Sequence, residues 1–257
     1  MDCRKKRGWV DHQPYFVSER RLLMDWFQRA GCPISWTVHP EMLMIESKRP
    51  LKVLTSAVYG SDRFTCKRMI NRHVGRDYAA KNPEGEIRDW LTRKKIPLEE
   101  TVVLMTAARV ERVCHRFAVE KTFKMDVFVT AGVGNAARAG EPNPVFWNDQ
   151  EYTPHTINTM VVIDGRMTQA AMVNAVITAT EAKAAALQDL KVTDARGNPA
   201  TGTTTDAILI ASTQDPARND VHAYAGLSSP LGSALGKAVF EAVKEAVLKE
   251  RYGEERR

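Results

Sequence analysis

Apolar residues in the second half of the chain follow two alternating patterns, that of a buried strand and that of a helix. The runs DVFVTAG and TMVVID are compact and apolar, which is typical of strands buried on both faces. From about Thr168 to Leu190 the apolar spacing is close to the helical repeat, and the run DAILIAS after it predicts another strand. Two strands joined by a long helix indicate a right-handed crossover, so part of the sheet should be parallel.

A second long helix is predicted for SSPLGSALGKAVFEAVKEAVLKE. Ser229 is suited to cap its first turn, and Pro230 fits the first helical position, where no backbone N–H is needed. Its apolar side is formed by residues four apart, namely Leu235, Val239, Val243 and Val247.

The first hundred residues predict mixed α+β structure. SERRLLMDWFQRAG has the pattern of a capped helix, and EGEIRDWLTRKK predicts a short helix after Pro83. WTV and MLMIES flank a turn at His39-Pro40 and LKVLTSAVYG follows, which together predict a small antiparallel meander. TVVLMTAA is a further buried strand. The expected fold class is α/β, a mixed, partly parallel sheet flanked by helices, with an α+β N-terminal portion of the same domain.

Composition is that of a globular protein. The 257 residues are 44% hydrophobic and 26% charged, which suits one domain over 1–257 with a core from about 43 to 250. TVVLMTAA is soon followed by Arg109 and Glu111, and no apolar run approaches the roughly 20 residues of a membrane helix. MDCRKKRGWV lacks the apolar segment of a secretory signal. We therefore expect a cytoplasmic protein with no membrane partner; the sequence leaves a homo-oligomer possible.

The formal charge of +6 raises the alternative of a basic nucleic-acid-binding α/β protein without enzymatic activity. Much of the excess lies in MDCRKKR, TRKK and the final ERR, which are loop or terminal positions. No basic motif with interleaved aromatic residues is present. No nucleic-acid partner is expected.

Cysteine and histidine spacing does not favour a disulfide framework or a dedicated metal site. The four cysteines show no CxxC pair, and the six histidines show neither HExxH nor an i, i+4 pair. These residues are Cys3, Cys32, Cys66, Cys114, His12, His39, His73, His115, His155 and His222.

One charge interrupts the apolar side of the helix that ends at Leu190. Lys183 falls within the arc of Met172, Val176, Thr180, Leu187 and Leu190, while Glu181 lies at its edge. The aliphatic stem of Lys183 could follow the surface with its ammonium in water, or the ammonium could meet a carboxylate partner.

Three stretches rich in glycine, threonine or asparagine lie at strand ends, where open α/β sheets bind ligands. TAGVGNAARAG contains a GxGxxA pattern, but Pro142 and Pro144 prevent a helix, so a turn that offers backbone N–H groups is favoured over a dinucleotide site. ATGTTTD is either a turn whose hydroxyls satisfy its own backbone or a loop that positions an amide or water beside Asp206. TINTM places Asn158 at a strand start after the loop EPNPVFWNDQEYTPH, whose length is typical of a binding element or a lid.

Five ordered motifs together resemble the adenosylcobinamide amidohydrolase family. They are TAGVGNAARAG, TINTMVVIDG, VNAVITATEAKAAALQDL, ATGTTTDAILIAS and YAGLSSPLGSALGKAVFEAV. LTSAVYG and the TAA of VLMTAARV also fit, so the resemblance spans about Leu43 to Val247. The chain departs from the family at YGSDRF, where a glycine-rich loop is expected, and at His155, where a glycine is usual.

The resemblance implies hydrolysis of the amide that joins the aminopropanol arm of adenosylcobinamide to the corrin ring. The product, adenosylcobyric acid, re-enters coenzyme B12 synthesis. The corrinoid would be the small-molecule partner and would bring its own cobalt, so no cofactor of the protein's own and no protein metal site are expected.

Amide hydrolysis needs a nucleophile, a proton shuttle and donors to the oxyanion. Glu181 is the first candidate base and Asp206 the second, with Lys183 as partner of a carboxylate or of the oxyanion. Thr203 or Thr205 is an alternative, covalent nucleophile. The expected substrate-binding residues are Asn135, Asn158, Thr130, Gly132, Thr201 and Gly202.

Overall fold

The computed structural model describes residues 34–142 and 155–254. The helix expected between Ser18 and Gly31 and most of the expected lid loop lie outside these residues. The described elements are β1 (Ile34–His39), β2 (Met42–Thr55), β3 (Thr65–His73), α2 (Pro83–Arg93), β4 (Thr101–Thr106), a 3₁₀ turn (Val110–Arg112), β5 (Cys114–Val119), β6 (Lys124–Ala131), β7 (Ala136–Ala137), β8 (Ile157–Asp164), β9 (Arg166–Met167), α3 (Gln169–Asp189), β10 (Gly202–Thr203), β11 (Ala207–Ser212), β12 (Val221–His222) and α4 (Pro230–Glu254).

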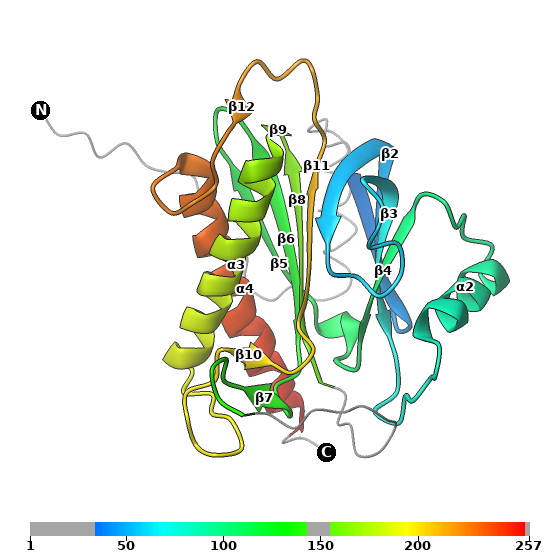
Figure 1. Cartoon of the computed structure of the whole chain (residues 1–257), viewed down its shortest axis with the longest axis vertical. Coiled ribbons are helices and arrows are strands. Elements are labelled where there is room, and N and C mark those ends of the chain that lie inside the picture. Colours follow the sequence, from blue (N-terminus) through cyan, green and yellow to red (C-terminus); the bar gives the residue numbers. More distant parts are fainter. Residues whose placement is uncertain (1–33, 143–154, 255–257) are drawn as a thin grey trace, which may run out of the picture.

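An eight-stranded mixed sheet organises the described residues (Figure 1). Its order is β4-β3-β2-β11-β8-β6-β5, and β1 pairs with the first half of β2. The pairs β8–β11 and β3–β4 are parallel and the other pairs are antiparallel. The α/β class with a partly parallel sheet is therefore confirmed. The expected parallel pair is β8 and β11, which precede and follow the long helix in the sequence.

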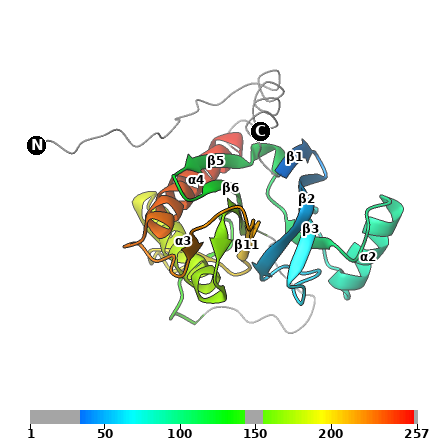
Figure 2. The ribbon, with the colours of Figure 1, turned by 90° about the horizontal axis from the view of Figure 1, so that it is seen from above.

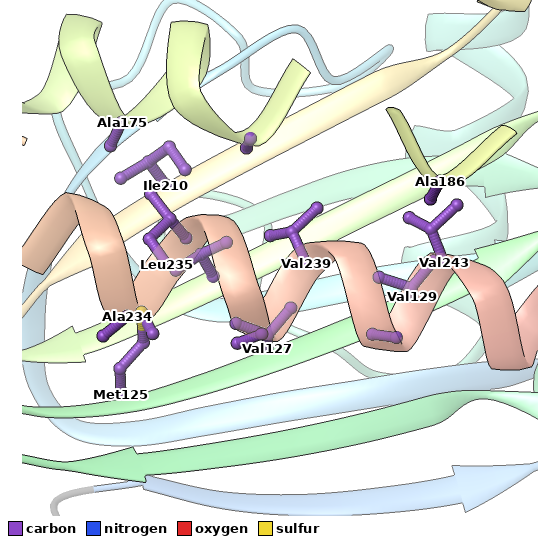
Figure 3. Close-up of a cluster of buried hydrophobic side chains, with 14 of the residues drawn as sticks. Met125, Val127, Val129, Ala175, Ala186, Ile210, Ala234, Leu235, Val239 and Val243 are labelled. Carbon is purple, nitrogen blue, oxygen red and sulfur yellow. The ribbon is translucent and has the colours of Figure 1, made fainter. Parts of the chain in front are cut away.

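The helices α3 and α4 cover one face of this sheet. Thr168 caps α3, since its hydroxyl accepts a hydrogen bond from Ala171 N at 3.1 Å, and Ser229 caps α4 through Gly232 N at 3.0 Å. The predicted boundaries of α3 and the predicted start of α4 are confirmed, whereas α4 continues past the predicted end at Glu250 to Glu254. Figure 3 shows the side chains of α4 between α3 and the strands, in a core that includes Leu235, Val239, Val243, Val127, Val129 and Ile210.

The N-terminal strands of the same sheet pack against the opposite face of its central strands. Figure 2 shows them to one side of β6 and β11. A second core contains Leu43 and Ile45 of β2 together with Phe128 of β6 and Met160 of β8. The register between β2 and β3 shifts between Glu46 and Leu51, where Pro50 cannot donate to the ladder. The strands β6, β8 and β11 are thus buried on both faces, which explains their unbroken apolar runs.

Two expectations for the N-terminal strands are wrong. LKVLT is not a separate strand but the second half of β2, which continues past Pro50 with a shift in register. The third strand of the meander is β3, TCKRMINRH, which the apolar pattern does not reveal. Its charges are matched by neighbouring elements, for example Lys67 by Glu100 at 2.9 Å and Arg68 by Glu46 at 3.1 Å.

The predicted apolar arc of α3 is displaced from the observed one. Thr180 is exposed, whereas small residues make much of the buried side: Ala171, Ala175, Thr178, Ala179 and Ala186. Alanine packs where helices approach closely, and its weak hydrophobic signal leaves the inward face of such a helix poorly defined in the sequence. None of the described helices is long and apolar enough to cross a membrane.

Candidate active site

Lys183 of α3 and Asp206, which directly precedes β11, form an ion pair. Their side chains are only 13% and 16% exposed. The lysine ammonium therefore meets one of the two carboxylates that the sequence offered, rather than reaching freely into water. Since a partly buried pair is weakly screened by solvent, it keeps a defined geometry where α3 crosses the starts of β8 and β11.

Asp206 is the centre of a hydrogen-bonded turn. Its Oδ1 accepts from the backbone N–H of Ile157 at 3.1 Å and from the Thr203 hydroxyl. Its Oδ2 accepts from Thr203 N at 3.1 Å and from Lys183 Nζ. The carboxylate thus joins the start of β8, the Thr203 turn and α3, so these three elements have fixed relative positions.

A small cavity of about 160 Å³ opens beside this pair. Its walls come from three elements: α3 supplies Lys183 and Thr180, β8 supplies Thr159, and the start of β11 supplies Asp206 and Ile208. The cavity therefore combines a cation, a carboxylate and hydroxyls with apolar walls, which suits a polar reacting group on an apolar support.

Gly202 allows the ion pair to lie against the backbone. A Cβ at this position would lie 2.8 Å from Lys183 Nζ and still closer to Asp206 Oδ2. Gly202→Ala should therefore displace the pair and lower turnover by about tenfold or more, because a shift of about 1 Å at a reacting group can cost on the order of 10². Steady-state kinetics on adenosylcobinamide, the substrate that the resemblance implies, measure this effect.

Gly236→Ala is the matched control for Gly202→Ala. A Cβ at Gly236 in α4 would meet the flexible end of Leu227 at 2.9 Å, which can move. Normal turnover is expected for this variant. Equal turnover of the two variants would contradict a role for the Gly202 contact.

Most hydroxyls of the ATGTTTD loop are engaged by neighbouring groups. Thr205 donates to His155 O at 2.8 Å, and Thr201 accepts from Ala139 N at 2.9 Å. Thr204 accepts from the Asn135 amide at 2.7 Å. The loop and the Gly132–Asn135 turn thus hold each other, while the short strands β7 and β10 pair beside them. The hydroxyls therefore satisfy the turn and its neighbours, which is the first of the two roles that the sequence suggested; a role in positioning an amide or water beside Asp206 stays a prediction.

Asn158 and Thr130, expected to bind substrate, lie in a buried polar network on the far side of the sheet from α3. Asn158 Nδ2 donates to Asn71 Oδ1 and to Met105 O, each at 2.8 Å, and Asn71 Nδ2 donates to Thr130 Oγ1 at 2.8 Å. The three side chains are at most 2% exposed. The network joins β3 and β4 to β6 and β8, so it links the two layers of strands.

Glu181 lies on the exposed side of α3. Side chains two residues apart on a helix point in directions that differ by about 160°. Glu181 therefore points away from Lys183 and from the cavity. Among the described residues, no hydrogen bond or ion pair involves its carboxylate. The structure thus brings Lys183, Asp206, Gly202 and Thr203 together but leaves Glu181 apart from them.

The two departures from the family pattern occupy packed positions. The ring of His155 packs against the turn at Gly132 and Gly134, where a Cβ would meet it at 2.9 Å and 2.6 Å. In YGSDRF, Arg63 lies over the ring of Tyr59 at 4.9 Å, and Tyr59 is fully buried. The His155 ring therefore supports the turn at Gly132 and Gly134, whereas Arg63 and Tyr59 support the YGSDRF loop itself.

Sequence reasoning missed two residues. Thr159 lines the cavity but is hidden within the apolar run TMVVID, and Asn71 lies in the strand β3 that the pattern did not reveal. Period-two alternation along β8 would have placed Thr159 on the face of Ile157 and Val161, toward α3. No comparable signal indicates Asn71.

Neither a metal cluster nor a reactive thiol is found in the part of the chain that the structure describes. There, no three His, Cys, Asp or Glu side chains are grouped to hold a metal ion. Burial raises the pKa of the Cys66 and Cys114 thiols to about 12, so neither is a ready nucleophile.

A larger cavity of about 790 Å³ lies at the opposite ends of β8 and β11. Thr159 in the smaller cavity and Asp164 in the larger one are five residues apart on β8, which is about 17 Å of strand. The larger one is lined by charged groups such as Arg218 and Asp164, which pair with each other. Three of the five sequence motifs supply the lining of the smaller cavity, and for this reason it is the candidate site; these motifs are TINTMVVIDG, VNAVITATEAKAAALQDL and ATGTTTDAILIAS.

Comparison with known proteins decides the family. A family model described as adenosylcobinamide amidohydrolase matches residues 32–254, which include the ion pair and the cavity. The chain belongs to the adenosylcobinamide amidohydrolase family. A protein named adenosylcobinamide amidohydrolase from Methanosarcina mazei is 30% identical over 174 residues, which are 64% of this chain and 74% of that protein.

Two solved structures are similar to this chain at lower sequence identity. A Burkholderia sp. beta-aminopeptidase is 14% identical with a TM-score of 0.41, over 82% of this chain and 78% of that chain. A protein from Pyrococcus horikoshii OT3 is 13% identical with a TM-score of 0.40, over 84% of this chain and 78% of that chain. Likenesses at these scores carry no argument about function.

Proposed function

We propose that this amidohydrolase cleaves the amide between the corrin ring and the aminopropanol arm of adenosylcobinamide. The products are adenosylcobyric acid and 1-amino-2-propanol, and the acid returns to coenzyme B12 synthesis in corrinoid salvage. The family match over residues 32–254 carries this conclusion. The basic nucleic-acid-binding alternative is not favoured.

The size of the cavity supports entry of the arm alone. Pockets that enclose drug-sized ligands measure about 300–1,000 Å³, and a corrinoid is larger than such ligands. The 160 Å³ beside Lys183 suits one amide and its short substituent. We infer that the amide enters the cavity while the corrin ring stays outside it.

Lys183 is proposed to stabilise the charge that develops on the amide. As the carbonyl carbon becomes tetrahedral, its oxygen gains negative charge, and a fixed ammonium in a partly dry cavity stabilises that charge. Asp206 holds the ammonium in place by the ion pair. Lys183 also lies on the wall from which a proton can pass to the leaving amine.

Cobalt is proposed to arrive within the corrinoid, so the hydrolysis needs no metal bound by the protein. Amide cleavage consumes one water and changes no oxidation state. The protein's own contribution is then a nucleophile, a proton path and a charge for the oxyanion.

The test is incubation of the purified protein with adenosylcobinamide, with mass detection of both products. Equal turnover is expected before and after dialysis against a chelator. Loss on dialysis that zinc or manganese restores would contradict the metal-free mechanism. Absence of product, with tight and salt-dependent nucleic-acid binding, would favour the alternative function.

A further inference from the structure

Thr159 is the hydroxyl of the site that no neighbour engages. It is 4% exposed and lines the cavity together with Lys183 and Asp206. In the described part of the chain, no hydrogen bond involves its side chain. The Thr159 hydroxyl is therefore free to form a hydrogen bond with a molecule that enters the cavity.

The other threonine hydroxyls around the cavity already have partners. Thr180 donates to Val176 O at 2.8 Å and Thr156 donates to Thr205 O at 2.7 Å. Thr203 donates to Asp206 and does not line the cavity. Asp206 also accepts from Lys183 and from two backbone N–H groups, so the Thr203 hydroxyl is one of four donors that hold this carboxylate in place.

Strand β8 holds Thr159 in place. Its backbone pairs with Ile208 of β11 on one side and Val129 of β6 on the other. Alternate residues of β8 face opposite layers: Ile157 and Val161 join the core under α3, and Met160 joins the other core. Thr159 therefore faces α3 and the cavity, on a rigid element that can hold a reacting atom in place.

We propose that Thr159 Oγ1 is the covalent nucleophile of the proposed amide hydrolysis. The inference rests on the proposed function and names the group that attacks. A cavity of about 160 Å³ has room for about five waters, and Thr159, Lys183 and Asp206 all line it. An amide that enters this space therefore meets a hydroxyl, a cation and a carboxylate, which are the kinds of group that covalent catalysis by a hydroxyl uses.

The first step forms an ester and releases the amine. The oxygen of Thr159 bonds to the amide carbon, the C–N bond breaks, and the hydroxyl proton passes along the Lys183–Asp206 side of the cavity to the leaving nitrogen. In the second step water attacks the ester, which releases adenosylcobyric acid and returns the proton to Thr159. The sum is one amide and one water converted to one acid and one amine.

Thr159→Val is the decisive variant. Valine has the shape of threonine and suits the apolar strand, and no protein hydrogen bond is lost. Turnover should fall on the order of 10³-fold or more with corrinoid binding retained. Thr159→Ser keeps a hydroxyl and should retain measurable turnover. Thr37→Val, at an exposed position in β1, is the matched control and should behave as the unchanged protein.

Hydroxylamine distinguishes a covalent nucleophile from a residue that positions water. It should divert part of the product of the unchanged protein to the hydroxamate of the corrinoid. Acid-quenched protein should also carry visible corrinoid absorbance through denaturing gel filtration, on the peptide that contains Thr159. Thr159→Val should give neither.

Three outcomes would overturn the inference. Turnover of Thr159→Val above about a tenth of normal would remove the hydroxyl from the reaction. An inactive Thr159→Val with no hydroxamate from the unchanged protein would make water the nucleophile. An adduct on Thr203 would move the nucleophile to that loop. If the unchanged protein never releases the amine, the proposed function itself fails, which is a separate result.

Discussion

Lys183→Met should lower turnover of adenosylcobinamide by about 10²–10³-fold, the usual cost of losing one donor to an oxyanion. Methionine keeps the apolar stem on α3 and removes only the ammonium that lies beside Asp206. Corrinoid binding should change by less than about tenfold, because the charge is needed most in the transition state. Steady-state turnover and equilibrium binding of the corrinoid measure the two effects.

The variant should remain folded because Asp206 keeps three of its four donors: Ile157 N, Thr203 N and the Thr203 hydroxyl. Lys244→Met is the control, because it breaks an exposed ion pair. This pair joins Lys244 of α4 to Asp189 of α3, the helix that also carries Lys183, at 3.1 Å. Its turnover should be normal. Near-normal turnover of Lys183→Met would remove the ion pair from the mechanism. Strong loss in Glu181→Gln with normal Lys183→Met would instead place the base on the exposed side of α3.

Asn158→Leu should lower the free energy of unfolding by about 2–5 kcal/mol. The substitution leaves Asn71 Oδ1 and Met105 O buried without their donor. Urea unfolding followed by circular dichroism measures the change. Asn219→Leu, at an exposed loop position, is the control and should change stability by less than about 0.5 kcal/mol.

A double-mutant cycle with Asn71→Leu tests whether the amides act as a unit. Leucine at both positions removes the mutual hydrogen bond from both sides, so the combined cost should be smaller than the sum of the two single costs. Strict additivity would show that Asn71 and Asn158 stabilise the fold independently. A loss of corrinoid affinity in Asn158→Leu without a loss of stability would restore the substrate-binding role that its sequence position suggested.

The sequence predicted the strands that are buried on both faces and the helices that are buried on one side. Strands β6, β8 and β11 and helices α3 and α4 have apolar patterns long enough to identify them. Strand β3 was missed because its partly buried charges are compensated by ion pairs with β2, with α2 and with Glu100, which directly precedes β4. Such compensation depends on which elements become neighbours, and this information is not present within the strand's own residues.

The site was predicted in the same uneven way. Lys183 and Asp206 could be predicted because a charge on an apolar helix face needs a partner, and the loop before β11 offered one. The direction of Glu181 required the true inward face of α3, which alanines define and hydrophobicity does not. Thr159 has the sequence environment of a core residue, and only the space left beside it distinguishes it from one.

Neighbouring residues of β8 serve different layers, and this limits how the protein can diverge. Asn158 faces the network that joins the strand layers, while Thr159 faces the cavity under α3. Deletion or insertion of one residue in the turn before Ile157 would shift β8 by one position against both neighbours. In one direction Thr159 would replace the structural amide and Met160 would face the cavity; in the other Asn158 would enter the cavity and Ile157 would replace the amide. Relatives that retain both functions should therefore vary in the length of the preceding loop only where β8 can keep its register.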